Sequence, residues 1–219
     1  MNKRIVIWGA SGHARVVADI FRLNGWAIAG FLDDVNPRAH ATKFCGSQIL
    51  GGKEKLESLK RGGVDRISIA IGIGRARMES ALLAEELGFV LTSAIHPKAI
   101  IASDAQIGAG TVLAAGAIVN ANTELGRNVI INTGATVDHD CIIDDGAHIC
   151  PGTHVAANVK IGKLSWIGIG SAVIERINIG ANVMIGAGAV VVADIPDGVV
   201  AYGNPARIRR PIKESDYCS

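Results

Sequence analysis

Aromatic side chains are scarce in this sequence: Phe, Trp and Tyr together make up 4% of its 219 residues. Glycine occurs 27 times and small aliphatic residues are abundant. A core must therefore be filled by Ile, Val and Ala rather than by large rings, which favours narrow, repetitive packing. The length allows one or two domains and a sizeable buried core.

Cysteine, net charge and long apolar runs are limited too. The sequence has four cysteines, and no two of them form a CxxC motif (Cys45, Cys141, Cys150 and Cys218). We therefore expect free thiols in a reducing compartment. A net charge of +2 is too balanced to indicate nucleic acid or a membrane surface as a partner. No apolar run reaches the roughly 18 residues of a membrane span, and the first residues lack a signal-peptide pattern. We therefore expect a cytoplasmic protein.

A period of six residues dominates the second half of the chain. Every sixth residue from Ile101 to Val191 is aliphatic. The position three residues later is Gly, Asn or Asp except at Leu164 and Arg176, and these residue types tolerate the left-handed backbone of a tight corner. The position four residues later is small or aliphatic. This pattern describes one flat face of a triangular prism, and three faces make a coil of about 18 residues.

Such coils stack about 4.8 Å apart around an aliphatic ladder, so the sequence predicts a left-handed parallel β-helix. An amphipathic helix needs apolar residues at intervals of three and four, which the sixfold pattern excludes. The repeat runs without an insertion. A functional site must therefore be made from coil side chains and neighbouring surfaces.

Residues 1–95 lack the period of six, and strand-like and helix-like patterns alternate along them. This alternation argues for a small parallel sheet of doubly wound type. The expected strands are residues 5–8, 27–32, 67–71 and 89–95, and the expected helices are the segment up to residue 23 and residues 53–60 and 77–87. The sequence thus predicts an α/β domain over 1–95 and a β-helix domain with a C-terminal tail over 96–219.

The first expected strand ends in a glycine turn that could hold a phosphate at a helix N-terminus. The turn reads G-x-x-G-x-A from Gly9 and lacks the full dinucleotide fingerprint, so a tight connection without a ligand is an equal alternative. Asp33 and Asp34 favour a nucleotide, because an acidic side chain after the second strand accepts hydrogen bonds from ribose or base groups in such folds. Hydride chemistry is not favoured.

Among the six histidines, His139 is the candidate for proton transfer. It lies between Asp138 and Asp140, and a neighbouring carboxylate orients an imidazole and raises its basicity. The combination is a general-base arrangement. The alternative for His139 is an exposed surface histidine without a catalytic role. The alternative for Asp140 is an ordinary corner residue of the coil.

His148 lies nine residues beyond His139, half a coil away, so the two should face different directions. A shared pocket would need a second subunit. Metal binding is the competing interpretation, but His148 and His154 have no clear third ligand nearby in sequence. We therefore expect no metal. Cysteine catalysis is not expected either, because neither Cys141 nor Cys150 has a base beside it.

Several motifs together give the chain a family resemblance over essentially its full length. They are Gly9-Ala-Ser-Gly-His-Ala14, Phe31-Leu-Asp-Asp34, Ala70-Ile-Gly72, Ile95-His-Pro97, Asn132-Thr-Gly-Ala-Thr-Val-Asp-His-Asp-Cys141 and Gly203-Asn-Pro-Ala206. The sequence resembles the sialic-acid O-acetyltransferase-like group of hexapeptide acyltransferases, and most closely its nucleotide-4-amino-sugar N-acetyltransferases.

This resemblance implies a Rossmann-like N-terminal domain that grips a nucleotide-sugar and a homotrimer with sites between adjacent solenoids. The implied nucleotide-sugar contacts are Ser11, Gly12, His13, Asp33, Asp34 and Gly72. The implied catalytic base is His139, with Asp140 as the acidic neighbour, where relatives often carry Glu. The implied acetyl-CoA contacts are His148, which would touch the acetyl group, and Ala157, Ile169 and Ala187; Ala157 replaces an expected Gly.

The activity implied is direct acetyl transfer from acetyl-CoA to the 4-amino group of a nucleotide-linked 4-amino-4,6-dideoxy sugar, for surface glycan biosynthesis (O-antigen, capsule or glycoprotein). Acetyl-CoA is the expected co-substrate. The first alternative is O-acetylation of a free sugar such as sialic acid, which requires no nucleotide-binding site. The second is a non-catalytic nucleotide-binding solenoid.

Overall fold

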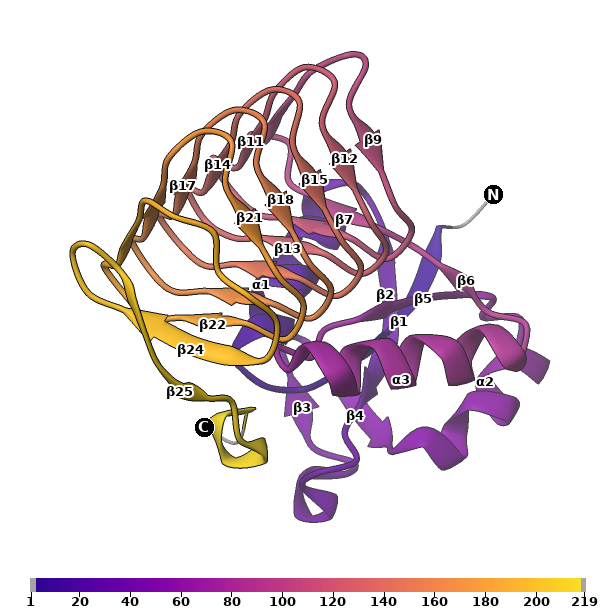
Figure 1. Ribbon diagram of the computed structural model, residues 1–219. Coiled ribbons are helices and arrows are strands. Elements are labelled where there is room, and N and C mark those ends of the chain that lie inside the picture. The colour runs from indigo at the N-terminus through magenta and orange to yellow at the C-terminus, as the bar shows by residue number, and fades with distance from the viewer. Residues whose placement is uncertain (1–2, 218–219) are drawn as a thin grey trace.

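A six-stranded sheet organises the N-terminal part of the computed structural model, which describes residues 3–217 (Figure 1). The strand order is β3-β4-β2-β1-β5-β6, with every pair parallel except β3 and β4. The strands are β1 (Arg4–Trp8), β2 (Ala27–Leu32), β3 (Lys43–Phe44), β4 (Ser47–Gly51), β5 (Arg66–Ile69) and β6 (Val90–Leu91). The helices are α1 (Gly12–Leu23), α2 (Leu56–Arg61) and α3 (Gly74–Glu86), with short 3₁₀ turns at Pro37–Ala39 and Lys53–Lys55.

Both faces of this sheet are covered, because β1 is apolar on each side of its pleat. Ile5 and Ile7 pack with α1 and with the solenoid, whereas Val6 and Trp8 pack with α2 and α3. The helix expected from residue 77 begins earlier, at Gly74. The one expected at residues 53–60 is a 3₁₀ turn followed by α2.

The second part is a solenoid of two-residue strands in three stacked sheets (Figure 1). Each strand pairs in parallel with the strand one coil later, for example Ile130 with His148 and His148 with Trp166. The second residue of each strand points inward and forms one continuous core that runs from Leu113 to Val191 and beyond. The predicted α/β part followed by a left-handed parallel β-helix is confirmed.

The prism of the solenoid has three faces. The docked face consists of β7 (Ala94–Ile95), β10 (Val112–Leu113), β13 (Ile130–Ile131), β16 (His148–Ile149), β19 (Trp166–Ile167) and β22 (Met184–Ile185). The second face consists of β8 (Ile100–Ile101), β11 (Ile118–Val119), β14 (Thr136–Val137), β17 (His154–Val155), β20 (Ala172–Val173) and β23 (Val190–Val191). The third face consists of β9 (Gln106–Ile107), β12 (Glu124–Leu125), β15 (Ile142–Ile143), β18 (Lys160–Ile161) and β21 (Asn178–Ile179).

The corners between faces carry the left-handed residues that the sequence predicts. Asn122, Asp140 and Asn158 have φ of 54°, 59° and 59°, and the two exceptions to the Gly, Asn or Asp pattern adopt the same conformation: Leu164 has φ 61° and Arg176 has φ 60°. Corner geometry is thus imposed by the coil even where the residue type does not favour it.

The docked face packs against the N-terminal part, since the outward side chains of Ala94, Val112 and Ile130 belong to the same buried cluster as α1 and β1. Beyond the last coil, β24 (Val199–Tyr202) pairs with β22 and, in antiparallel fashion, with β25 (Arg207–Pro211); a 3₁₀ turn at Glu214–Tyr217 follows. Cys45, Cys141 and Cys150 are free thiols, and Cys218 lies outside the described residues. Within residues 3–217, every helix is too short or too polar to cross a bilayer.

The ladder gives a direct stability test. Ile143 is fully buried, whereas the preceding Ile142 points outward and is 37% exposed. Ile143→Ala should lower the free energy of unfolding by about 2–5 kcal/mol, because it opens a cavity between coils. Ile142→Ala, the matched control, should cost less than about 1 kcal/mol. Urea unfolding followed by circular dichroism measures both, and equal losses would contradict the inward and outward assignment.

Candidate active site

His139 lies at a corner between the second and third faces, immediately before the left-handed Asp140. Its Nδ1 is 2.6 Å from Oδ2 of Asp140, and both side chains are about half exposed. An ionised carboxylate only accepts hydrogen bonds, so Nδ1 carries the proton and Nε2 holds the free lone pair. The pKa of His139 is raised, first by this hydrogen bond and further by the charges of Asp138 and Asp140.

The preceding coil supplies the partners that hold these two carboxylates. Asn120 donates to Asp138 at 2.9 Å and Asn122 donates to Asp140 at 2.6 Å, each from one coil to the next. The pKa of Asp140 is lowered by Asn122 and then by His139; that of Asp138 is lowered by the backbone N–H of His139 and then by Asn120. Both carboxylates thus stay ionised beside the imidazole. Sequence reasoning missed the two asparagines, although the one-coil spacing could have revealed them.

A cavity of about 870 Å³ lies where the carboxyl ends of β1, β2 and β5 approach the docked face. Its lining includes five of the six residues predicted to contact a nucleotide-sugar, namely Ser11, His13, Asp33, Asp34 and Gly72. The sixth, Gly12, is the exposed first residue of α1. The carboxyl ends of parallel strands are the usual ligand position in open α/β sheets. The structure therefore brings five of the six predicted nucleotide contacts together in one cavity.

The two acidic residues of this cavity differ in what they can still bind. Asp34 accepts hydrogen bonds from the Trp8 indole at 2.6 Å and from the backbone N–H of Lys53 at 2.8 Å, so both its oxygens are engaged. Asp33 uses Oδ1 to accept the backbone N–H groups of Val35 and Asn36. Within residues 3–217, Oδ2 of Asp33 has no hydrogen-bond partner. Asp33 is thus the acid with capacity for a ligand hydroxyl or base, and Asp34 shapes the wall.

The N-terminus of α1 is open toward an anion. Ser11 is the N-cap residue, but its hydroxyl makes no capping hydrogen bond, and the first turn contains no acidic residue. The first N–H groups of the helix and its positive dipole end can therefore meet a phosphate.

Two solenoid side chains complete the cavity, Trp166 and Met184. They are the outward residues of successive strands on the docked face, one coil apart and directly beyond His148 in the same column. Sequence reasoning missed both. A tryptophan at an outward position of a chain so poor in aromatics was the available signal.

His148 is buried on the docked face, with 6% of its surface exposed. Its ring centroid is 4.3 Å from that of Trp166 and 6.4 Å from that of His13. Asn132 presents its amide nitrogen to Nε2 of His148 at 3.0 Å, because its oxygen accepts the backbone N–H of Thr133. Nε2 is therefore the acceptor, and a neutral His148 carries its proton on Nδ1.

Burial and a nearby cation keep His13 and His148 neutral. The pKa of His13 is lowered to about 4, first by burial and then by Arg77. The pKa of His148 is lowered by burial, then by Arg77 and His13. Both side chains are therefore uncharged at neutral pH, whereas the pKa of His139 is shifted in the opposite direction.

The predicted acetyl-CoA contacts are divided between two edges of the second face. Ala157 lies one coil beyond His139 at the corner with the third face, since the backbone N–H of the adjoining Asn158 donates to the carbonyl of His139. Ile169 and Ala187 lie one coil apart at the corner with the docked face. One chain therefore does not gather His139, His148 and these contacts at one place.

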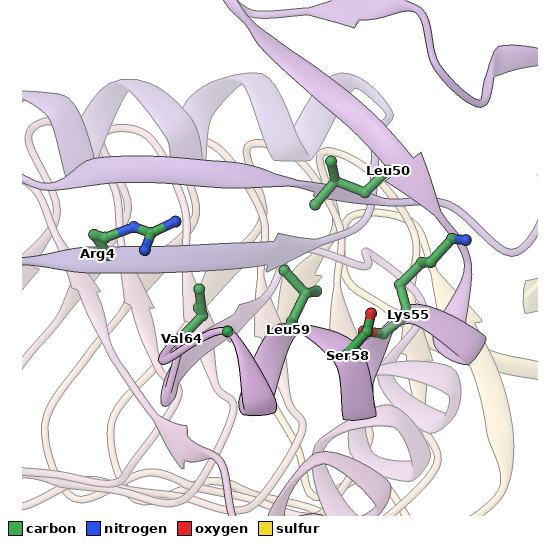
Figure 2. Close-up of a pocket in the computed structure, with 7 residues that line it drawn as sticks. Arg4, Leu50, Lys55, Ser58, Leu59 and Val64 are labelled. Atoms are coloured by element: carbon green, nitrogen blue, oxygen red, sulfur yellow. The ribbon is translucent and has the colours of Figure 1, made fainter.

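His154 and the smaller hollow of the molecule lie apart from this arrangement. His154 lies on the second face, where its Nδ1 is 2.9 Å from the Thr136 hydroxyl. The part of the chain that the structure describes holds no group of three or more potential metal-ligating side chains. A shallow pocket of about 290 Å³ between the sheet and α2 is lined by Arg4, Lys55, Ser58 and apolar neighbours, and contains none of the predicted site residues (Figure 2).

Comparisons with known proteins agree with this architecture. Residues 4–81 match the model of the PglD N-terminal domain family. PerB from Caulobacter crescentus, solved in complex with CoA and GDP-perosamine, superposes with a TM-score of 0.90 and 38% identity over 94% of this chain and 97% of that chain. The acetyltransferase domain of PglB from Neisseria gonorrhoeae superposes with a TM-score of 0.89 and 41% identity over 95% of this chain and 100% of that chain.

A curated relative matches only part of the chain. A putative acetyltransferase of Saccharomyces cerevisiae is 49% identical over 65 residues, which is 30% of this chain. The match spans about a third of that protein's own length (33%).

The carboxylates around His139 predict a measurable shift. Asp140→Asn should lower the pKa of His139, because it removes the hydrogen-bonded charge that stabilises the imidazolium. Asp138→Asn is the control and should lower the pKa less, since Asp138 acts on the ring only through its charge. Titration of the histidine ring resonances by NMR measures both pKa values. A larger effect of Asp138→Asn would refute the pairing seen here.

Proposed function

The chain belongs to the hexapeptide-repeat acyltransferases that include the sugar N-acetyltransferases, and on this premise we propose that it acetylates the 4-amino group of a nucleotide-linked 4-amino-4,6-dideoxy sugar with acetyl-CoA. The observation that carries the proposal is the pairing of His139 with Asp140, which leaves Nε2 free at an exposed corner. The cavity that gathers Ser11, His13 and Asp33 supports a nucleotide-sugar as the acceptor.

In the proposed reaction, His139 is the general base. The sugar amine attacks the carbonyl carbon of the thioester, Nε2 of His139 takes the proton from the attacking nitrogen, and the carbon–sulfur bond breaks to release CoA. General-base catalysis contributes about 10²–10⁴-fold. A hydrogen bond from His148 or from a backbone N–H would stabilise the negative charge that develops on the oxygen of the acetyl group. Nδ1 of His148 is buried and has no hydrogen-bond partner within residues 3–217, so a contact from this atom requires a shift of the surrounding side chains.

Direct transfer is favoured over an acyl-enzyme. Cys141 and Cys150 are buried, and burial raises the pKa of Cys141 and raises that of Cys150 to about 12. A thiolate at either position is therefore scarce at neutral pH, and thiolates rather than thiols are nucleophiles.

The division of the predicted residues between two edges supports a site that is shared between subunits. In a homotrimer of parallel solenoids, the edge of one chain that carries His139 and Ala157 can face the edge of its neighbour that carries Ile169 and Ala187. The second face between these edges is the less polar of the two free faces. Its outward residues are Ile100, Ile118, Thr136, His154, Ala172 and Val190, whereas those of the third face are Gln106, Glu124, Ile142, Lys160 and Asn178. Apolar surface of this kind marks interfaces.

The proposal does not specify whether the nucleoside is uridine, thymidine or guanosine. PerB was solved with GDP-perosamine, and one curated relative, from Aneurinibacillus thermoaerophilus, is a dTDP-3-amino-3,6-dideoxy-galactopyranose 3-N-acetyltransferase that matches over 20% of this chain. We propose that the protein acts in the cytoplasm, in the assembly of a surface glycan, which agrees with its free thiols.

The direct test of the activity is CoA release, followed with a thiol reagent. Purified protein and acetyl-CoA should release CoA rapidly with one member of a panel of UDP-, dTDP- and GDP-linked 4-amino-4,6-dideoxy sugars. His139→Ala should bind both substrates and be slower by about 10²–10⁴-fold. Release with free sialic acid alone would favour the O-acetyltransferase alternative. If the protein binds a nucleotide but releases no CoA with any acceptor, the result would favour a non-catalytic solenoid.

A mixing experiment tests whether the site is shared. Ala76 lines the cavity, so Ala76→Trp should block acceptor binding, and neither this variant nor His139→Ala should be active alone. Co-expressed chains should regain activity, because an open cavity on one chain then meets an intact His139 on its neighbour. Two wild-type chains co-expressed in the same way serve as the reference. A site within one chain predicts no recovery.

A further inference from the structure

Arg77 is the largest fully buried side chain of the described residues and has none of its surface exposed. It lies on α3, which runs along the corner between the third and docked faces (Figure 1). No carboxylate within residues 3–217 pairs with it. Burial lowers the pKa of Arg77 to about 10, so the guanidinium remains charged at neutral pH. A buried charge without a counter-ion is costly and needs full hydrogen bonding.

That hydrogen bonding comes from four backbone carbonyls in two parts of the molecule. The guanidinium donates to the carbonyls of Ile71 and Gly72 at 2.8 and 2.6 Å, in the loop after β5. It also donates to the carbonyls of Asn128 and Gly146 at 2.8 and 2.7 Å. Asn128 and Gly146 occupy the same corner of successive coils. One side chain thus joins the loop to two coils of the solenoid.

The loop held in this way is one wall of the cavity. Ile71, Gly72 and Ile73 line it, and so does Ala76 in the first turns of α3. The facing wall belongs to the docked face, which contributes Trp166 and Met184. Gly146 precedes His148 by two residues. The geometry of Arg77 therefore sets the spacing between the wall that would grip the nucleotide and the solenoid side chains that would face the sugar.

Other contacts show how closely α3 approaches the solenoid. A Cβ atom added at Gly74 would lie 2.8 Å from the carbonyl oxygen of Gly146. At the far end of the helix, Arg127 pairs with Glu85 at 2.5 Å. An apolar side chain at position 77 would fill the space, but only the planar fork of arginine reaches carbonyls on both sides at once.

We propose that Arg77 is a positioning residue that fixes the register between the nucleotide-binding wall and the solenoid half of the acceptor site. This rests on the proposed function for the identity of the ligands. Arg77 touches no reacting atom. Its role is to keep the bound nucleotide-sugar aligned with the groups of the solenoid, where a displacement of about 1 Å can cost about 10²-fold in rate.

The test compares Arg77→Lys and Arg77→Met with the matched control Arg75→Lys, which changes an arginine of the same helix whose side chain is 56% exposed. Both Arg77 variants should lower kcat/KM for the nucleotide-sugar by about 10²-fold and weaken binding of UDP, dTDP or GDP, whichever the wild-type protein binds. Their affinity for CoA, which lacks the acetyl group that His148 would touch, should stay within about twofold, because the other predicted contacts (Ala157, Ile169 and Ala187) lie at other corners. Arg75→Lys should behave as wild type.

Gly74→Ala provides a second route that leaves Arg77 in place. The added methyl group must push α3 away from Gly146, so kcat/KM for the nucleotide-sugar should fall while CoA affinity holds. This variant keeps the test informative if an Arg77 variant does not fold.

The outcomes separate the possible roles of Arg77. A purely structural role predicts a lower melting temperature with an unchanged KM and an unchanged nucleoside diphosphate affinity, which would overturn the proposal. Wild-type kinetics in Arg77→Lys would overturn it too, because charge alone would then suffice. A wild-type protein that binds no nucleoside diphosphate and releases no CoA would instead contradict the proposed function.

Discussion

The stacking of one coil on the next is the constraint on which the rest of this structure depends. Parallel hydrogen bonding between coils and an uninterrupted inward ladder hold each face flat, so a residue's height and face follow from its place in the repeat. Functional side chains can therefore be aligned simply by a spacing of one coil. Asn122 supports Asp140 in this way, and His148, Trp166 and Met184 form one column on the docked face.

The same rigidity explains why the N-terminal part is needed. A prism with flat faces and no excursion loop offers edges but no deep pocket, whereas nucleotide-sized ligands require a concave site. Docking an α/β sheet on one face creates that concavity between two surfaces, each of which would be open alone. The alignment of the two surfaces then becomes the critical quantity, and it depends on the few groups that cross the boundary, of which Arg77 makes the most extensive set of hydrogen bonds.

The sequence predicts those features that repeat and misses those that do not. The period of six predicts the inward ladder, the corners and the outward position of His139, because each depends only on neighbours at fixed spacing. It cannot say which face is covered, since docking involves a non-repeating partner. Burial of His148, the cavity wall formed by Trp166 and the bridging role of Arg77 all follow from that docking. The glycine turn and Asp33 were predictable because parallel strands bring their carboxyl ends to one edge.

Three histidines show how one residue type acquires opposite properties in this fold. His139 is exposed beside two carboxylates, and its pKa is raised. His13 is partly buried and His148 is buried, both near the cation of Arg77, and their pKa values are lowered. Environments that push pKa values apart are the usual means by which a site separates proton transfer from hydrogen bonding. His139 is therefore the most basic of the three rings, while His13 and His148 remain neutral at neutral pH. The buried cation thus has a second consequence beyond geometry: it disfavours protonation of His13 and His148, which supports the proposed assignment of proton transfer to His139.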